Sequence, residues 1–302
     1  MAEVKTLGYK TGFAAVIGRP NVGKSTLVNK IIGQKIAIMS DKPQTTRSRI
    51  RCIFTDEEAQ IIFLDTPGIH KPKYKLGEYM LEAAEGTLKE VDVIVFVTDA
   101  TEKFGGGERY ILERLKATTV PVILALNKVD MLEREKLLPI IEEYSRRREF
   151  AAIVPISARE GDNVEELISE IKKHLPEGMA YYPEDMITDQ PERLITAELI
   201  REKILQSTQE EIPHSVAVDV DEFAQREKGK VYIRATIYVE RESQKGIIIG
   251  KNGAMLRSIG TAARPDIEMM LGEKVFLDLW VKVKRDWRNS ASMLNQLGMR
   301  ND

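Results

Sequence analysis

The segment GRPNVGKS at residues 18–25 restricts the fold of this chain more than any other feature. It matches the pattern G-x-x-x-x-G-K-[ST], in which glycines allow main-chain N–H groups to wrap the phosphates of a nucleotide. The apolar run 13–17 precedes the segment, and the helix-like stretch 24–32 follows it. A strand, a glycine-rich loop and a helix in this order predict an α/β domain with a phosphate site at the amino terminus of the helix.

Two side chains of this loop have roles that follow from their chemistry. Lys24 should reach the β- and γ-phosphates, and Ser25 should ligate Mg²⁺ through its hydroxyl group. We expect nucleotide contacts from the whole loop and the next residue: Gly18, Arg19, Pro20, Asn21, Val22, Gly23, Lys24, Ser25 and Thr26.

Short apolar runs alternate with helical stretches over the first 175 residues. The runs 91–97 and 120–126 are apolar on both faces, as in the centre of a parallel sheet that helices cover on both sides. The pattern predicts an α/β fold with a mostly parallel six-stranded sheet. Strands are expected at 13–17, 50–54, 61–65, 91–98, 120–126 and 152–155, and helices at 24–32, 76–88, 107–117, 133–148 and 164–174.

Three further motifs stand at the ends of expected strands. DTPG at 65–68 offers a carboxylate for Mg²⁺, usually through water, and a glycine amide for the γ-phosphate. NKVD at 127–130 ends with an Asp whose carboxylate can accept both the N1–H and the exocyclic amine of guanine, which adenine cannot match. SAR at 157–159 can meet the guanine carbonyl with its main chain. The added nucleotide contacts are Asp65, Thr66, Pro67, Gly68, Ile69, Asn127, Lys128, Asp130, Ser157, Ala158 and Arg159.

This ordered set resembles the translation-factor-related class of P-loop GTPases over roughly residues 10–175. The resemblance implies that PQTTR at 43–47 is the first switch, in which one threonine completes the Mg²⁺ shell when the γ-phosphate is present. Thr45 and Thr46 both satisfy this chemistry, and we take Thr46 as the ligand beside Ser25 and Asp65. Lys24, Thr46 and Gly68 are then the residues that act on the γ-phosphate.

Two positions bear on the rate of hydrolysis. Ile69 stands where Ras-like relatives carry the glutamine that orients the attacking water, and an aliphatic side chain cannot hydrogen-bond water. We therefore expect slow intrinsic turnover. Asn21 matches an asparagine that helps hold K⁺ in some related GTPases, and a hydrogen bond within the loop is the other role open to it.

The remainder of the chain has a different pattern. The proline-rich stretch 176–192 predicts a linker between a domain at 1–175 and a domain at 193–302. In the second domain we expect helices near 191–211, 254–271 and 286–297, and strands at 215–223, 230–240 and 274–284, with Lys-Gly at 228–229 between the first two strands. This order predicts an α+β domain with a three-stranded sheet.

The motif GKNG at 250–253 lies between two helical stretches of that domain. The element order resembles a KH domain of the prokaryotic type (type II), which binds single-stranded nucleic acid and clamps about four nucleotides with its G-x-x-G loop. Residues 241–288 hold ten Lys/Arg and six Asp/Glu, a mildly basic balance that suits a polyanion. The candidate RNA contacts are Lys245, Ile248, Gly250, Lys251, Asn252, Gly253, Arg257, Lys282, Lys284 and Arg285. Arg288 is a further candidate for a phosphate contact.

The combination resembles the bacterial Era GTPases over nearly the whole chain, including KPQTTRSRI, DTPGIHKPK and IIIGKNGAMLRSIG. The resemblance implies GTP/GDP and Mg²⁺ as cofactors and the single-stranded 3′ end of the small-subunit (16S) ribosomal RNA as partner. It also implies a role in 30S subunit assembly and peripheral association with the inner membrane.

The cysteine content and the amino-terminal sequence exclude some classes of protein. Cys52 is the single cysteine, so an intramolecular disulfide is excluded. The first ten residues lack the apolar core of a signal peptide, so we expect a cytoplasmic protein, and we take a monomer as the default. One alternative is a regulatory GTPase whose carboxyl-terminal domain docks a protein or membrane partner. A P-loop kinase and an RNA-binding module without turnover are the others.

Overall fold

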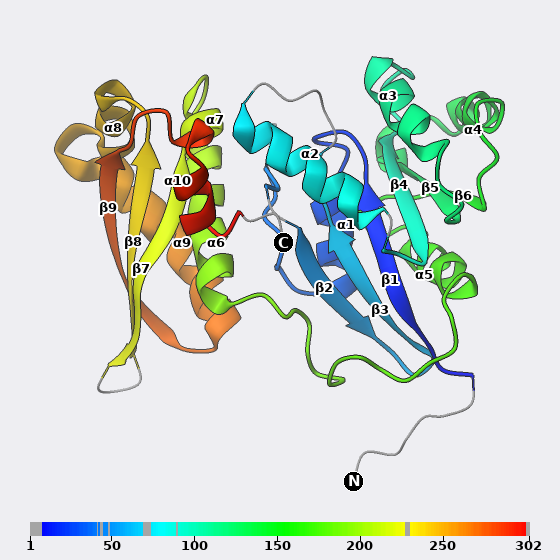
Figure 1. Cartoon of the computed structure of the whole chain (residues 1–302), viewed down its shortest axis with the longest axis horizontal. Helices are drawn as coiled ribbons and strands as arrows, with labels where there is room; N and C mark the ends of the chain where they lie inside the picture. The colour runs from blue at the N-terminus through cyan, green and yellow to red at the C-terminus, as the bar shows by residue number, and fades with distance from the viewer. Residues whose placement is uncertain are drawn as a thin grey trace, which may run out of the picture. The chain divides into compact units, whose positions relative to one another are not determined.

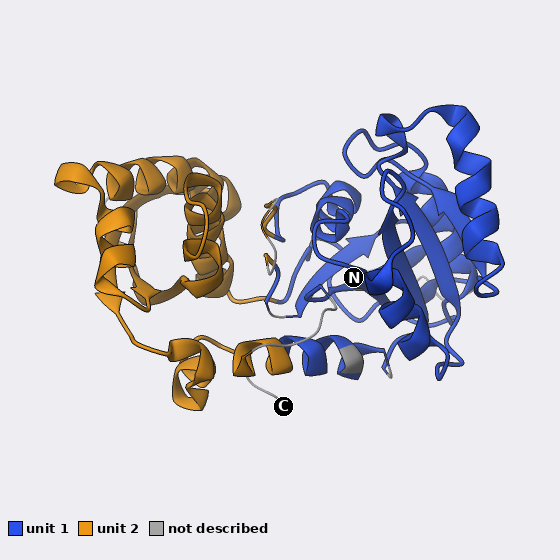
Figure 2. Cartoon of the chain, turned by 90° about the horizontal axis from the view of Figure 1, so that it is seen from above, with its two compact units in different colours: residues 1–37, 46–71, 80–189 blue, residues 38–45, 72–79, 190–302 orange. Residues whose placement is uncertain are grey.

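Figure 1 shows the computed structural model of the chain, which describes residues 8–40, 42, 45–47, 49–68, 74–88, 90–226 and 230–299. The chain divides into two compact units, coloured in Figure 2. Unit 1 consists of residues 1–37, 46–71 and 80–189, and unit 2 consists of residues 38–45, 72–79 and 190–302. Two short segments early in the chain therefore belong to the second unit, although unit 1 residues flank them in sequence.

Unit 1 contains the expected mostly parallel six-stranded sheet, with the strand order β2-β3-β1-β4-β5-β6. Only β2 runs antiparallel to its neighbour, and the prediction of the fold class is confirmed. The strands are β1 (Lys10–Ile17), β2 (Ile50–Thr55), β3 (Ala59–Asp65), β4 (Val93–Asp99), β5 (Val122–Asn127) and β6 (Ala152–Pro155). Every residue of β3, β4 and β5 is buried, which explains why these strands read as continuous apolar runs.

The first five helices begin and end close to the expected positions, with one clear difference. They are α1 (Lys24–Ile32), α2 (Lys75–Thr87), α3 (Gly106–Leu115), α4 (Leu137–Ser145) and α5 (Val164–Lys173), of which α2 belongs to unit 2 up to Tyr79 and to unit 1 from Met80. The helix expected from residue 133 begins instead as a 3₁₀ turn at Arg134–Lys136, and α4 starts at Leu137. Pro139 lies in the first turn of α4, where its missing N–H costs no hydrogen bond, so the sequence fits the later start.

The parallel strands of unit 1 end at one edge of the sheet. The phosphate loop follows β1, DTPG begins at the last residue of β3, and NKVD begins at the last residue of β5. SAR follows β6 after one residue. In open α/β sheets ligands bind outside the carboxyl ends of the strands, so the topology alone brings the four motifs together.

The stretch expected as a linker is bound along unit 1 as far as residue 189. The side chain of Gln60, fully buried in β3, accepts hydrogen bonds from the N–H groups of Tyr181 and Tyr182 at 2.8 and 2.9 Å and donates to the Tyr182 carbonyl. Ile53 in β2 donates its N–H to the carbonyl of Ile187, and Arg51 forms an ion pair with Asp189 at 2.7 Å. Proline content predicted irregular backbone here, but these hydrogen bonds show an ordered strap.

Unit 2 contains the expected three-stranded sheet, in which β8 lies between β7 and β9. The strands are β7 (Ala217–Arg226), β8 (Lys230–Val239) and β9 (Lys274–Val283), with β7 antiparallel and β9 parallel to β8. The helices are α6 (Glu192–Ser207), α7 (Ile212–Ser215), α8 (Glu242–Ile249), α9 (Ala254–Leu271) and α10 (Ala291–Gln296). The prediction of an α+β domain is confirmed, while the Lys-Gly pair at 228–229 lies outside the described residues.

Both outer helices of unit 2 differ from their expected bounds. The helix expected to reach residue 211 ends at Ser207, and the short α7 follows it. The last helix is divided into a 3₁₀ turn at Trp287–Asn289 and α10, because the Ser290 hydroxyl caps α10 by accepting the N–H of Met293. Within the described residues no helix combines the length and the apolar character that a membrane span requires.

Candidate nucleotide site and RNA-binding turn

The loop between β1 and α1 has the conformation that its glycines predict. Gly23 precedes α1 at a φ of 98°, and a Cβ atom there would lie 2.2 Å from Nδ2 of Asn127. A Cβ at Gly18 would lie 2.3 Å from the carbonyl oxygen of Val97. Asn21 also has a positive φ, 66°, which asparagine tolerates better than most residues. The backbone therefore approaches its neighbours as closely as a loop that wraps phosphates must.

Lys24 is buried at the start of α1. Its ammonium group donates to the carbonyl oxygens of Gly18 and Arg19 at 3.3 and 3.0 Å. Burial lowers the pKa of Lys24 to about 8, although the nearby Asp65 carboxylate acts in the opposite direction. The charge of the buried Lys24 is only partly balanced by groups of the protein itself. Such a cation fits a site that binds a polyanion.

Three oxygen atoms meet where a divalent ion would bind. The Ser25 hydroxyl lies 2.8 Å from Asp65 Oδ2 and 3.0 Å from the Thr46 hydroxyl, which itself lies 3.4 Å from the same carboxylate oxygen. Burial raises the pKa of Asp65, and the other carboxylate oxygen, Oδ1, has no hydrogen-bond partner among the described residues. Two hydroxyls and one carboxylate, completed by phosphates and water, form the hard oxygen shell that Mg²⁺ prefers.

The two threonines of the first switch point to different partners. Thr46 is buried beside Ser25 and Asp65, whereas the Thr45 hydroxyl donates to the carbonyl of Lys42 at 2.6 Å. The carbonyl oxygen of Thr45 accepts a hydrogen bond from Arg201 in α6. The geometry therefore favours Thr46 over Thr45 as the candidate metal ligand.

The guanine motif is joined to the phosphate loop through Asn127. Its side chain donates to the Val22 carbonyl at 2.7 Å and accepts the N–H of Ala158 at 2.9 Å. Asn127 thus connects the phosphate loop, the end of β5 and the SAR segment. Asp130 is exposed, so its carboxylate is accessible to a base.

The lysine of the same motif is held by a residue that the motifs did not indicate. Lys128 has a left-handed φ of 68°, and its ammonium group pairs with Asp99 at 2.5 Å. Burial alone would raise the pKa of Asp99, but hydrogen bonds from Lys128 and Thr101 outweigh it and hold that pKa below its ordinary value. Asp99 is the last residue of β4. Its position at the carboxyl end of a central parallel strand is the sequence feature by which it could have been predicted as a site residue.

The remaining predicted nucleotide residues occupy the same edge of the sheet. A Cβ at Gly68 would lie 2.8 Å from the main-chain nitrogen of Pro20, and the buried Thr66 hydroxyl donates to the Val16 carbonyl at 2.9 Å. Thr26 lies in the first turn of α1 and Pro67 in the loop after β3. Ser157 is buried, whereas the Arg159 side chain projects into solvent. Ile69, the residue from which slow turnover was predicted, lies outside the described residues.

Two further contacts escaped the motif analysis because they involve ordinary polar residues that belong to none of the motifs. Arg19 pairs with the buried Glu108 in α3 at 2.7 Å and with Glu102 at the same distance, which ties the phosphate loop to α3. Asn29, buried in α1, accepts the N–H groups of Ile36 and Ala37 at 3.0 and 2.9 Å and so fixes the start of the segment that leads to the first switch. A buried asparagine inside a helix is unfavourable by propensity, and that mismatch was the available signal.

The GKNG turn of unit 2 is also built from left-handed residues. Gly250, Asn252 and Gly253 have φ values of 71°, 50° and 76°. A Cβ at Gly250 would lie 2.7 Å from Cβ of Met255, and Gly253 is the residue that precedes α9. Lys251 and Asn252 are exposed at the tip of the turn. The turn therefore presents a cation and the amino terminus of an 18-residue helix to the same space.

The expected RNA contacts separate into accessible and inaccessible side chains. Exposed or half-buried cations suited to phosphates are Lys245, Lys251, Arg257, Lys282, Lys284 and Arg285. Ile248 is 0% exposed, so its expected contact with RNA is wrong and it belongs to the core; the neighbouring Ile247 is 52% exposed. Arg288, also expected to meet phosphate, instead pairs with Glu240 and lies 4.2 Å from the centre of the Tyr74 ring.

Comparison with known proteins identifies the family. Residues 13–128 match the family described as 50S ribosome-binding GTPase, and residues 211–288 match the KH domain family. A crystal structure of Era in complex with MgGDPNP and nucleotides 1506–1542 of 16S ribosomal RNA is 44% identical, covers 97% of this chain and 100% of its own, and has a TM-score of 0.94. The chain belongs to the Era family. A single-substitution variant of Aquifex aeolicus Era bound to GDP·AlF4⁻ gives 45% identity, the same coverage and a TM-score of 0.93, so membership makes this chain a GTPase that uses GTP, GDP and Mg²⁺.

Substitution of the two threonines should separate their roles in this Era family member. Thr46→Ala removes a hydroxyl beside Ser25 and Asp65, so we expect the affinity for a GTP analogue in Mg²⁺ to fall about 10- to 100-fold, with little change for GDP. Thr45→Ala is the matched control, because its hydroxyl donates to the nearby Lys42 carbonyl rather than to the candidate metal ligands. Titration with a fluorescent GTP analogue and GDP measures both, and equal losses in the two variants would contradict the assignment.

Base selection should depend on Asp130. Asp130→Asn replaces an acceptor by a donor opposite the exocyclic amine, so GTP affinity should fall at least about 100-fold, while xanthosine triphosphate, which has an oxygen at that position, should gain affinity. Asp162→Asn, an exposed neighbouring carboxylate, is the control and should leave both affinities unchanged. Competition binding with GTP, XTP and ATP provides the measurement. Retained preference for GTP in Asp130→Asn would refute this account of the base site.

Proposed function

We propose that this protein is a GTP-hydrolysing switch that binds 16S ribosomal RNA through its KH unit and acts in assembly of the 30S ribosomal subunit. The support is the relative in complex with nucleotides 1506–1542 of that RNA, which aligns over both units of this chain. The matched GTPase family bears a name that refers to the 50S subunit. We favour the small subunit, because the 50S name covers only unit 1 whereas the RNA-binding turn lies in unit 2.

The residues of unit 1 fit a magnesium-bound triphosphate. Lys24 and the amides of the phosphate loop would hold the phosphates, and Ser25, Thr46 and Asp65 would hold Mg²⁺ directly or through water. The ion, when bound, neutralises charge that develops on the transferred phosphoryl group. The chain itself positions these oxygens, keeps Lys24 and Asp65 away from water, and selects guanine through Asp130.

The proposal of a nucleotide-dependent switch rests on one observation: the segment that immediately precedes Thr46 belongs to unit 2. Glu202 in α6, fully buried, accepts the N–H of Met39 at 2.9 Å, and the buried Arg201 donates to the Thr45 carbonyl. Arg201 is also paired with Glu198, which orients its guanidinium group. Helix α6 therefore holds both ends of residues 39–45, so a change at Thr46 on γ-phosphate binding is transmitted to the unit that carries the GKNG turn.

RNA affinity should consequently depend on the bound nucleotide, and RNA should shift GTP affinity by the same factor. With full-length protein and a synthetic RNA of nucleotides 1506–1542, we expect Kd to differ several-fold between GDPNP and GDP. Arg201→Met should bring this ratio close to 1 without abolishing either binding reaction. Gln206→Met, an exposed position on the same helix, is the control and should keep the wild-type ratio.

The same titration tests RNA binding itself. Affinity should fall steeply as salt rises, because phosphate contacts release counterions. A wild-type protein that fails to bind this RNA would overturn the proposed function and favour a unit 2 that docks a protein or membrane partner. An unchanged GDPNP-to-GDP ratio in Arg201→Met would instead remove only the proposed route through α6.

Potassium is a further proposed cofactor. Asn21 stands in the phosphate loop with a left-handed backbone, where its side chain and the loop carbonyls can face an ion beside the phosphates. We expect multiple-turnover GTP hydrolysis to be several-fold faster in potassium than in sodium buffer, and Asn21→Asp, which tolerates the same backbone conformation, to change that ratio. Equal rates in the two buffers would exclude the ion.

Five further properties stay proposals. From the sequence we propose a division into domains at 1–175 and 193–302, a monomeric state, slow intrinsic turnover and a cytoplasmic location; the family resemblance adds peripheral association with the inner membrane. Sedimentation, single-turnover kinetics and membrane fractionation of the full-length protein test them separately.

A further inference from the structure

The exposed face of the sheet in unit 2 carries aromatic rings at its edge strand. Phe276 and Trp280, both in β9, are 62% and 56% exposed. Side chains alternate along a strand, so these two lie on one face, about 13 Å apart. The other tryptophan, Trp287, is 0% exposed and donates its indole N–H to the Ser215 carbonyl, as a core tryptophan should. Packing in the core therefore does not explain the presence of two large exposed rings on the edge strand of this sheet.

A layered stack leads across the sheet to Phe276. The guanidinium carbon of Arg226 in β7 lies 3.8 Å from the centre of the Tyr232 ring in β8. The rings of Tyr232 and Phe276 are stacked, with centroids 5.8 Å apart and planes 13° apart. Because β9 is the last strand of this sheet, the stack ends at the edge with Phe276, whose exposure leaves room for one more planar group.

Asp278 fixes the groups between the two exposed rings. It accepts hydrogen bonds from the Tyr232 hydroxyl at 2.9 Å, from Arg234 at 3.1 Å and from the Trp280 indole. Arg234 also donates to the Tyr232 hydroxyl at 2.7 Å. This network holds the aromatic side chains in place before any ligand arrives, which reduces the ordering cost of binding.

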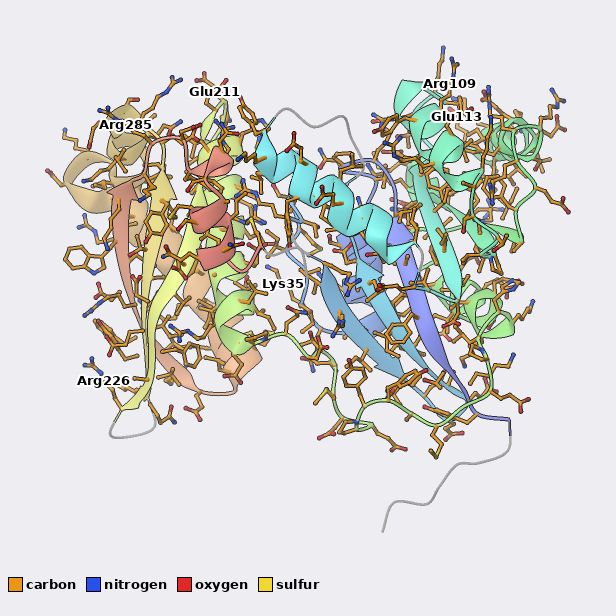
Figure 3. All side chains as sticks on the ribbon, in the orientation of Figure 1. Lys35, Arg109, Glu113, Glu211, Arg226 and Arg285 are labelled. Atoms are coloured by element: carbon orange, nitrogen blue, oxygen red, sulfur yellow. The ribbon has the colours of Figure 1, made fainter. Side chains whose placement is uncertain are left out.

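Basic side chains surround these rings and slightly outnumber the acidic ones. The cross-strand register places the same-face residues in rows, and near the rings these rows contain five basic side chains, Arg226, Lys230, Arg234, Lys274 and Lys282. The acidic ones in the same rows are Asp219, Glu222 and Asp278, and Asp221 accepts a hydrogen bond from Thr236 in the row of Trp280. Figure 3 shows Arg226 and Arg285 near opposite ends of the sheet, so a basic side chain stands at each end. Planar rings amid cations suit the bases and phosphates of a single strand.

Other parts of unit 2 leave this edge open. Helix α10 lies in front of β7 in Figure 1, and its Gln296 hydrogen-bonds Asp219 of β7. The buried face of β9 packs against α8 and α9, the helices on either side of the GKNG turn. Strand β9 therefore packs against the two helices that flank the GKNG turn, while its exposed rings lie on the opposite face of the sheet.

We propose that the edge formed by Phe276 and Trp280 is a second RNA contact, on which unpaired bases adjacent to those held by the GKNG turn stack. The stack Arg226–Tyr232–Phe276 accepts one base at its open end, and Trp280 accepts another. The surrounding lysines and arginines meet the phosphates between them. This inference rests on the proposed binding of RNA by unit 2 and extends it to a face of the sheet outside the KH turn.

The test compares three changes in the full-length protein bound to GDPNP, with a synthetic RNA of nucleotides 1506–1542 of 16S ribosomal RNA as probe. Phe276→Leu with Trp280→Leu removes both rings; Phe276→Tyr with Trp280→Phe keeps rings at both positions. Lys251→Glu with Asn252→Asp alters the turn and keeps residue types that tolerate its backbone. Stacking contributes about 1–3 kcal/mol per base, so we expect the leucine pair to weaken binding about 10-fold or more and the ring-preserving pair to stay within about threefold of wild type.

Salt dependence and fluorescence give readouts that a loss of charge or of folding would not reproduce. The leucine pair should lower affinity by the same factor at low and high salt, whereas the turn variant should also reduce the salt slope by about one unit per lost phosphate contact. RNA should quench the fluorescence of wild type but not of Trp280→Phe, whose remaining indole is buried.

Each outcome decides one claim. Unchanged affinity in the leucine pair, with a loss in the turn variant, overturns the second contact and leaves RNA binding by the turn intact; the face would then serve a protein or only shield the sheet edge. Loss in the leucine pair that the ring-preserving pair does not restore also overturns stacking. A wild-type protein without affinity for this RNA overturns the proposed function as a whole.

Discussion

Two buried charges, Lys24 and Asp65, organise the nucleotide site, and the chain alone leaves both only partly compensated. Burial shifts the pKa of each toward its neutral form, which is the direction expected for charges removed from water without full partners. A triphosphate and Mg²⁺ supply the missing counter-charges. The left-handed glycines and the hydrogen bonds of Asn127 keep the surrounding backbone in the conformation that receives these ligands. The strained backbone and the buried charges lower the stability of the ligand-free fold, and the site is preorganised for binding.

The proposed coupling between nucleotide and RNA depends on how the chain is divided between the two units. The residues just before Thr46 belong to the same compact unit as the GKNG turn, and α6 holds them through Arg201 and Glu202. One contiguous segment thus ends at the candidate metal ligand Thr46 and is held by the unit that carries the GKNG turn. A two-state element that both ligands bias is what coupling between distant sites requires.

Features that depend on neighbouring residues were predictable from the sequence of this protein. The direction in which a side chain points, and contacts between residues far apart in sequence, were not. The phosphate loop, the all-apolar strands and the KH element order depend on neighbours in sequence, so motifs and periodicity located them. The choice between Thr45 and Thr46, or between Ile247 and Ile248, depends on which way identical adjacent side chains point, which composition does not specify. The contact of Glu202 with Met39 joins residues 163 positions apart, and only the folded chain reveals it.

The strap at residues 181–189 has a consequence for the behaviour of the protein in concentrated solution. Strand β2 is the outermost strand on its side of the six-stranded sheet, and an outer strand with free N–H and carbonyl groups can recruit strands from other molecules. Ile187 and Thr188 occupy those groups at Ile53 and Arg51. A protease cut or a substitution that releases this strap would therefore appear first as self-association, while guanine nucleotide recognition at the far edge of the sheet persists.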